Sequence, residues 1–82
     1  MKNPRVIIYT KDDCPNCEIA KQILSHAHIE YIDVDIMRGS RLQNFLAEYP
    51  DARQMPQIFI NDQRVGGVAG LQTALRQLGM TI

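Results

Sequence analysis

The sequence predicts an α/β domain with four strands and three helices in the order βαβαββα. Two observations carry this prediction. Short apolar and β-branched runs alternate with stretches whose apolar residues recur every three or four positions, and proline, glycine or asparagine separates most of them. The 82 residues suffice for one modest hydrophobic core, so we expect residues 1–82 to form a single domain.

The first half of the chain is expected to form two strands around a helix. The run Val6–Thr10 is apolar and too short to be a helix of its own. Apolar residues then recur at helical spacing over Glu18–Ala27. Pro15 precedes this stretch and suits a first helical position, where its missing N–H costs nothing. Glu30–Ile36 alternates polar and apolar residues, which predicts a second strand with one face against the core.

The second half is expected to add a helix and then a hairpin. Ser40 is placed to cap a helix that extends to Tyr49 and is stopped by Pro50. The runs Gln57–Ile60 and Gln63–Val65 are separated by two turn-forming residues, Asn61 and Asp62, which predicts two antiparallel strands.

The chain is expected to close with a helix. Gly66 and Gly67 break the last strand, and apolar residues at helical spacing follow over Leu71–Leu78, with Gly79 at the end.

Composition excludes several classes of partner. Nine basic and nine acidic side chains balance, which argues against binding to nucleic acid or to anionic membranes. No apolar stretch approaches the roughly 20 residues of a membrane span, and the N-terminus leads into a strand pattern rather than a signal-peptide core. We therefore expect a cytoplasmic protein. In the cytosol a lone Cys-x-x-Cys is more often catalytic or metal-binding than structural.

The two cysteines of the chain, Cys14 and Cys17, lie where the first strand gives way to the first helix. Sulfurs at this spacing on a first helical turn are close enough to form a disulfide. The unpaired N–H groups and partial positive charge of a helix N-terminus favour the thiolate of Cys14. Lys11 adds a positive charge nearby, whereas Asp12 and Asp13 oppose it. The pattern predicts a redox-active dithiol.

Other uses of the cysteine pair stay open. A structural zinc site needs four ligands, and the remaining soft ligands are His26 and His28, which we expect to face solvent at the end of the first helix. The cysteines could also hold a bridging iron–sulfur cluster or border a groove that binds a partner peptide without catalysis.

Four separated segments resemble the glutaredoxins, the small glutathione-linked branch of the thioredoxin fold. The segments are Val6–Lys11 with Cys14–Cys17, Ala52–Pro56, Gln57–Ile60 and Val65–Gly67. The resemblance covers essentially the whole chain and implies a thioredoxin-like fold with a four-stranded mixed sheet flanked by three helices. It also implies that Cys14 attacks a disulfide, that Cys17 resolves the mixed disulfide, and that glutathione regenerates the dithiol.

The resemblance also implies residues that bind substrate. Pro56 matches the family's cis proline, which faces the dithiol and would turn the backbone of Met55 toward a peptide-like disulfide. Lys11 and Gln43 match the residues that hold the glycine carboxylate of glutathione.

Three positions depart from the family's pattern. Asn16 replaces an aromatic residue between the cysteines, and Gln54 replaces a threonine. The segment Val68–Gly70 lacks the acidic or hydroxyl residues that usually bind the γ-glutamyl end of glutathione. The N–H groups of Ala69 and Gly70 could still hold that carboxylate at a helix N-terminus. We therefore expect weak glutathione binding, and we expect Gly70→Asp to strengthen it without disturbing the fold.

These observations predict a glutathione-dependent thiol-disulfide oxidoreductase that reduces protein disulfides or glutathione mixed disulfides. We expect a monomer with no bound metal or prosthetic group, with glutathione as reducing co-substrate and disulfide-containing proteins as partners. One alternative is a glutaredoxin-like hydrogen donor for ribonucleotide reductase that thioredoxin reductase recharges, and the missing acidic contact at Ala69 and Gly70 favours it. An iron–sulfur-carrying or peptide-binding scaffold is the alternative from a different class.

Overall fold

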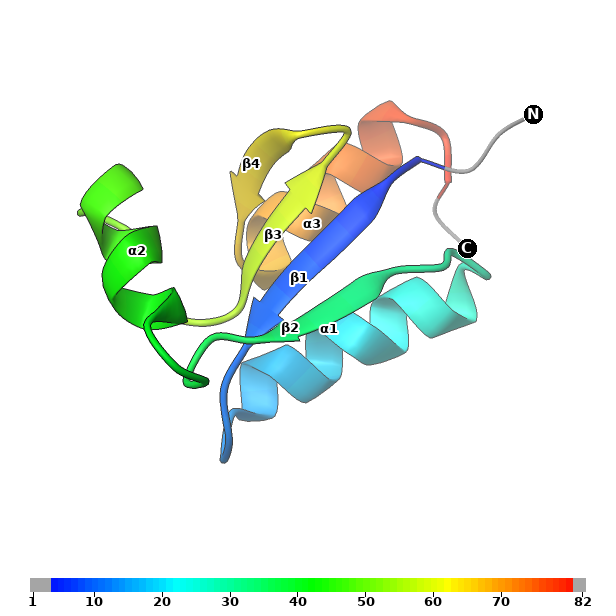
Figure 1. Ribbon diagram of the computed structural model, residues 1–82. Helices are drawn as coiled ribbons and strands as arrows, with labels where there is room; N and C mark the ends of the chain where they lie inside the picture. The colour runs from blue at the N-terminus through cyan, green and yellow to red at the C-terminus, as the bar shows by residue number, and fades with distance from the viewer. Residues whose placement is uncertain (1–3, 81–82) are drawn as a thin grey trace.

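The computed structural model describes residues 4–80 and has the predicted order of elements (Figure 1). These elements are β1 (Val6–Thr10), α1 (Pro15–His26), β2 (Ile32–Asp35), α2 (Arg41–Glu48), β3 (Gln57–Ile60), β4 (Gln63–Gly66) and α3 (Val68–Gln77). The strands form one mixed sheet in the order β2-β1-β3-β4. The predicted thioredoxin-like architecture is confirmed.

The central strand β1 contributes side chains to both faces of the sheet. It pairs in parallel with β2 and antiparallel with β3. Because side chains alternate along a strand, Ile8 faces α1 and α3 and is fully buried, whereas Tyr9 faces the side of α2 and is half-buried.

The larger core lies between the sheet and the pair α1 and α3. It buries the alternate residues of β1 and β3 against the helical stripes predicted from the sequence. Its members are Val6, Ile8, Ala20, Leu24, Ile29, Ile58, Ile60, Leu71 and Leu75. Fully burying one such leucine contributes about 1.5–3 kcal/mol, so this core holds α1 against the sheet.

A smaller aromatic cluster attaches α2 to the other face of the sheet. The cluster consists of Tyr9, Phe45, Tyr49 and Phe59. The ring centroids of its contacting pairs lie between 4.8 and 6.3 Å apart. The guanidinium of Arg64, on β4, lies 5.0 Å from the centroid of the Tyr49 ring. Figure 1 shows α2 at one end of the sheet, apart from α1 and α3.

The second strand is shorter and less buried than predicted. It covers Ile32–Asp35 rather than Glu30–Ile36, and the side chain of Ile32 is 54% exposed. Because β2 lies at the edge of the sheet, the expected packing of one face against the core holds only at its end, where Val34 is half-buried and lines a groove with Tyr9 and Phe45.

The second helix begins at the predicted place but without the predicted cap. Ser40 occupies the N-cap position of α2, yet its side chain makes no capping hydrogen bond. Its hydroxyl instead accepts a hydrogen bond from the side-chain amide of Asn44 at 3.3 Å. Ser40 therefore marks the start of α2 without satisfying its first N–H groups.

The hairpin agrees closely with the sequence, although β4 includes Gly66, one residue beyond the expected end at Val65. Asn61 and Asp62 both have positive φ angles, 50° and 69°, as a two-residue hairpin turn requires. Helix α3 begins at Val68, three residues before the expected Leu71, and Gly79 follows it with a φ of 69°. In residues 4–80, no helix has the length and apolar character needed to cross a membrane.

Candidate active site

The two cysteines lie at the N-terminus of α1 and are buried in a second hydrophobic cluster, which also contains Phe45. Cys14 is the N-cap residue and Pro15 is the first helical residue. The structure pairs Cys14 with Cys17 in a disulfide, with Cα atoms 5.2 Å apart. Cys14 is 8% exposed and Cys17 is 1% exposed, so Cys14 is the more accessible residue of the pair.

A hydrogen bond polarises the sulfur of Cys14. The backbone N–H of Cys17 donates to Cys14 Sγ at 3.1 Å, so the sulfur occupies the place of an ordinary capping oxygen. The same donor would stabilise a thiolate once the disulfide is reduced, together with the partial positive charge of the helix N-terminus. The local geometry thus supports the nucleophilic role assigned to Cys14.

The turn before β3 faces the dithiol. The Met55-Pro56 peptide bond is cis, as the family resemblance implied. The carbonyl oxygen of Met55 lies 3.6 Å from Cys14 Sγ. Met55 is itself buried, in the same hydrophobic cluster as Cys14 and Cys17.

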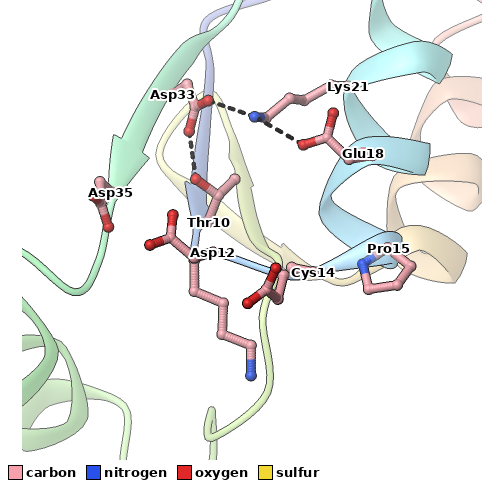
Figure 2. A pocket seen from close by; sticks show the side chains of 10 residues that line it. Thr10, Asp12, Cys14, Pro15, Glu18, Lys21, Asp33 and Asp35 are labelled. Carbon is pink, nitrogen blue, oxygen red and sulfur yellow. Dashed lines mark hydrogen bonds and ion pairs between the residues drawn. The ribbon is translucent and has the colours of Figure 1, made fainter.

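An acidic pocket of about 670 Å³ adjoins Cys14 (Figure 2). Five carboxylates line it, those of Asp12, Asp13, Glu18, Asp33 and Asp35. The two ammonium groups that line it belong to Lys11 and Lys21. Five negative charges against two positive charges make the environment of the dithiol on this side acidic.

One of these ammonium groups is already paired inside the pocket. Lys21 Nζ lies 2.8 Å from an oxygen of Asp33 and 3.4 Å from an oxygen of Glu18. The hydroxyl of Thr10 donates a hydrogen bond to Asp33 at 2.6 Å. Figure 2 shows these contacts joining β1, β2 and α1, which leaves Lys11 as the pocket's other ammonium group.

The contacts between Asp33, Lys21 and Thr10 shift two pKa values. The hydrogen bond to Asp33 raises the pKa of Lys21, against the opposing effect of burial. Burial pushes the pKa of Asp33 upward, but hydrogen bonds from Lys21 and Thr10 and the charge of Lys21 together hold it below its ordinary value. Both groups therefore stay charged at neutral pH.

A second pocket, of about 300 Å³, extends from Asn16, between the two cysteines, to the start of α3. Its lining includes Asn16, Met55, Pro56, Ala69 and Gly70. None of the described residues that line it has an ionisable side chain. The residue at the N-cap of α3 is a glycine, so no capping side chain covers the first N–H groups of that helix.

The geometry at Gly70 overturns one expectation. A Cβ on Gly70 would overlap the carbonyl oxygen of Val65, because α3 passes directly against β4 at this point. The prediction that Gly70→Asp would leave the fold undisturbed was therefore wrong. Ala69 is exposed and offers the neighbouring position for the same chemical test.

The structure brings together most of the residues predicted to bind substrate. Lys11 lines the acidic pocket, and Met55, Pro56, Ala69 and Gly70 line the second one. Gln43 is exposed on α2 and lines neither of these two pockets. The binding roles of all six stay predictions.

Sequence reasoning did not single out Asp33 and Lys21 as members of the site. They are twelve residues apart, and only the parallel pairing of β1 with β2 places Asp33 beside the first turns of α1. Within residues 4–80, no group of three or more histidine, cysteine and acidic side chains is arranged to hold a metal ion.

Comparisons with known proteins agree with this geometry. The profile of the glutaredoxin family matches residues 6–65. A glutaredoxin from Vernicia fordii is 36% identical over 80 residues, which cover 94% of this chain and 76% of that protein. Mouse mitochondrial glutaredoxin-2 is 31% identical over 84% of this chain, but the match spans only 46% of that longer protein.

Solved structures share the fold. Glutaredoxin 1 from Francisella tularensis, solved with cacodylate, superposes with a TM-score of 0.76 at 28% identity and covers 92% of this chain and 95% of that one. The NrdH-redoxin of Escherichia coli, a glutaredoxin-like protein with a thioredoxin-like activity profile, superposes with a TM-score of 0.66 at 24% identity, covering 77% of this chain and 82% of that one. At that identity the second likeness concerns the fold alone.

The family match extends over most of the chain, and the cysteine pair of that family lies at the N-terminus of α1 in the geometry that thiol exchange needs. The chain therefore belongs to the glutaredoxin family and is a thiol-disulfide oxidoreductase whose redox centre is Cys14 and Cys17.

Proposed function

We propose that this protein reduces protein disulfides and glutathione mixed disulfides in the cytoplasm, and that glutathione returns the dithiol to its reduced state. The observation that best supports the proposal is a pair of pockets beside the dithiol, one lined by Cys14 and the other by Asn16 and Met55. Lys11 lines one pocket, and the uncapped N-terminus of α3 lies in the other. Glutathione has a carboxylate at each end and a cysteine between them, so this arrangement offers each part a partner.

The reaction is a sequence of thiol–disulfide exchanges. The Cys14 thiolate attacks one sulfur of the substrate disulfide, forms a mixed disulfide and releases the other sulfur as a thiolate. Cys17, after losing its proton, then attacks Cys14 Sγ, releases the second substrate thiolate and forms the Cys14–Cys17 disulfide. Two glutathione molecules reverse that oxidation in the same way and leave as glutathione disulfide. No step requires a metal, a prosthetic group or a second copy of the chain.

The Met55 backbone would hold the substrate during attack. Its carbonyl oxygen already lies 3.6 Å from Cys14 Sγ. A peptide segment beside the substrate cysteine could pair with the N–H and C=O of Met55 as a short added strand. Such docking would align the two substrate sulfurs with Cys14 and reduce the entropic cost of reaction.

A second function is favoured by the charges around the dithiol. The acidic pocket holds five carboxylates, which repel an anionic tripeptide. The second pocket has no ionisable side chain to pair with the ammonium of the γ-glutamyl group. These features favour a hydrogen donor for ribonucleotide reductase that is recharged by thioredoxin reductase rather than by glutathione.

One experiment separates the two functions. The oxidised protein is incubated with glutathione in one sample and with NADPH and thioredoxin reductase in another, and its free thiols are counted by maleimide labelling and mass measurement. We expect glutathione to open the Cys14–Cys17 disulfide. If only the reductase opens it, the glutathione-dependent function is wrong and the alternative replaces it. Buffer alone serves as the control.

A further inference from the structure

Gln57 is a buried polar residue that the exchange reaction leaves without a role. It is the first residue of β3, lies opposite Tyr9 in the sheet and is 9% exposed. Its side-chain oxygen is buried and has no hydrogen-bond partner among the described residues. A half-satisfied buried amide stabilises a fold less than an apolar side chain of similar shape. Stability alone therefore does not account for glutamine at this position.

Among the described residues, the Gln57 side chain makes one hydrogen bond, which spans the turn that faces the dithiol. Its Nε2 donates to the backbone carbonyl of Gln54 at 2.8 Å, a normal distance for a strong N–H···O bond. Met55 and Pro56 lie between the two bonded residues. The side chain thus bridges the turn and fixes the direction of the Gln54 carbonyl group.

Holding this carbonyl also sets the direction of the neighbouring N–H. The carbonyl of Gln54 and the N–H of Met55 belong to one peptide unit, which is planar. In a trans unit the two groups point in opposite directions, and the cis bond in this turn is the following one, between Met55 and Pro56. With the Gln54 carbonyl directed at Gln57, the Met55 N–H is directed away from it and is left free of that contact.

We propose that Gln57 is a positioning residue, whose amide orients the Gln54–Met55 peptide plane so that the Met55 N–H can pair with a peptide disulfide bound at Cys14. The inference rests on the docking of substrate at Met55 under the proposed function, but not on which reductant recharges the dithiol. Gln57 acts through the backbone, because its own unpaired oxygen is buried. Its loss should slow reaction with peptide disulfides and spare reaction with disulfides that have no peptide backbone.

The test uses Gln57→Met, which keeps the length of the side chain and removes its donor. Gln72→Met, at an exposed position on α3, is the matched control. Pre-reduced proteins are mixed in single-turnover experiments with two probes, the disulfide-linked dimer of N-acetyl-Gly-Cys-Gly-amide and bis(2-hydroxyethyl) disulfide. Because neither experiment contains glutathione or a reductase, the result does not depend on the recharging step.

We expect Gln57→Met to react about five- to tenfold more slowly with the peptide disulfide. This rate ratio corresponds to the net free energy of about one hydrogen bond. Its rate with bis(2-hydroxyethyl) disulfide and its alkylation by iodoacetamide should match those of wild type, and Gln72→Met should behave as wild type throughout. An unchanged rate with the peptide would overturn the proposal. A parallel loss with both disulfides and with iodoacetamide would also overturn it, since that pattern indicates general damage to the site. A wild-type protein that shows no preference for the peptide probe would overturn docking at Met55 and this inference with it.

A second variant keeps the test informative if Gln57→Met folds poorly. Protonated glutamate in Gln57→Glu can donate an O–H to the Gln54 carbonyl, whereas the ionised form repels it. We expect the peptide rate of Gln57→Glu, taken as a ratio to wild type at each pH, to fall as the pH rises through the ionisation of this carboxyl. A ratio that stays constant with pH would contradict the proposed role.

Discussion

The backbone N–H of Cys17 donates a hydrogen bond to Cys14 Sγ at 3.1 Å, so one cysteine of the pair helps to stabilise charge on the other. Cys17 itself is almost fully buried. Among the described hydrogen bonds, no N–H group donates to its sulfur. The two thiols therefore have unequal environments, and their chemistry should differ accordingly.

We first predict that the thiol of reduced Cys14 ionises below about pH 8.5, the usual value for cysteine, and that Cys17 does not. The helix N-terminus and the Cys17 N–H favour the Cys14 thiolate, while the carboxylates of Asp12 and Asp13 limit the shift. The rate of alkylation against pH measures the midpoint. A midpoint at or above the ordinary value would contradict the activation of Cys14.

The second prediction concerns the separate roles of the two cysteines. Cys14→Ser should abolish all disulfide reduction, because it removes the attacking sulfur. Cys17→Ser should retain part of the activity toward glutathione mixed disulfides, because a second glutathione can replace the resolving thiol. An insulin-type dithiol assay and a deglutathionylation assay compare the variants. Equal loss of both activities in both variants would mean that the roles are assigned wrongly.

The third prediction follows from the ion pair between Asp33 and Lys21. Folding lowers the pKa of Asp33, so the carboxylate stabilises the fold above its unfolded pKa of about 3.9, and this contribution is lost as the pH falls through the lower folded value. The raised pKa of Lys21 keeps the contribution present up to the unfolded value for lysine, near pH 10.4, and it is lost as the pH rises through the higher folded value.

Asp33→Asn should therefore lower the free energy of unfolding at pH 7 by about 0.2–1 kcal/mol, because the pair is partly exposed. The difference from wild type should shrink toward zero in acid, below the folded pKa. Urea denaturation across this pH range provides the measurement. The control is Glu18→Gln, which removes the more exposed of the two carboxylates that contact Lys21. A difference that persists unchanged in acid would exclude the carboxylate charge as its source.

A fourth prediction tests the close approach of α3 to β4. Gly70→Ala should destabilise the protein by about 1–3 kcal/mol, since the added methyl group must displace backbone at Val65. Ala69→Ser, at the exposed neighbouring position, should leave thermal stability nearly unchanged. A Gly70→Ala protein as stable as wild type would show that the two elements can separate without cost.

The fifth prediction asks whether glutathione binds at the start of α3. Ala69→Asp places a carboxylate in the first turn of this helix, where it can pair with the ammonium of the γ-glutamyl group. An exposed ion pair is worth only about 0.2–1 kcal/mol, so glutathione efficiency should rise a few-fold at most. Steady-state kinetics over a range of glutathione concentrations measure this, with Ala69→Asn as the uncharged control. No gain in a normally folded variant would argue against this place for the γ-glutamyl end.

Much of the fold follows from local patterns in the sequence. The strand Val6–Thr10 and the turn at Asn61 and Asp62 were predicted residue by residue, because side-chain periodicity and turn chemistry act over a few neighbouring positions. The dithiol could be recognised for the same reason. Cys14 and Cys17 are close in sequence, and a helix that begins at Pro15 is enough to bring their sulfurs together.

The order of the elements and the place of the cysteine pair at a helix N-terminus therefore follow from local sequence, since each depends on short-range interactions. Four features depend on the tertiary structure. Two are the exposure of Ile32 on an edge strand and the overlap that a side chain at Gly70 would cause. The others are the pairing of Asp33 with Lys21 and the hydrogen bond from Gln57 to Gln54 across the turn. The first three depend on which strands become neighbours and on how closely a helix approaches them. The last depends on the path of the turn that brings Met55 to the dithiol. Strand order and backbone path depend on the packing of the entire core, so they cannot be predicted from a local sequence pattern.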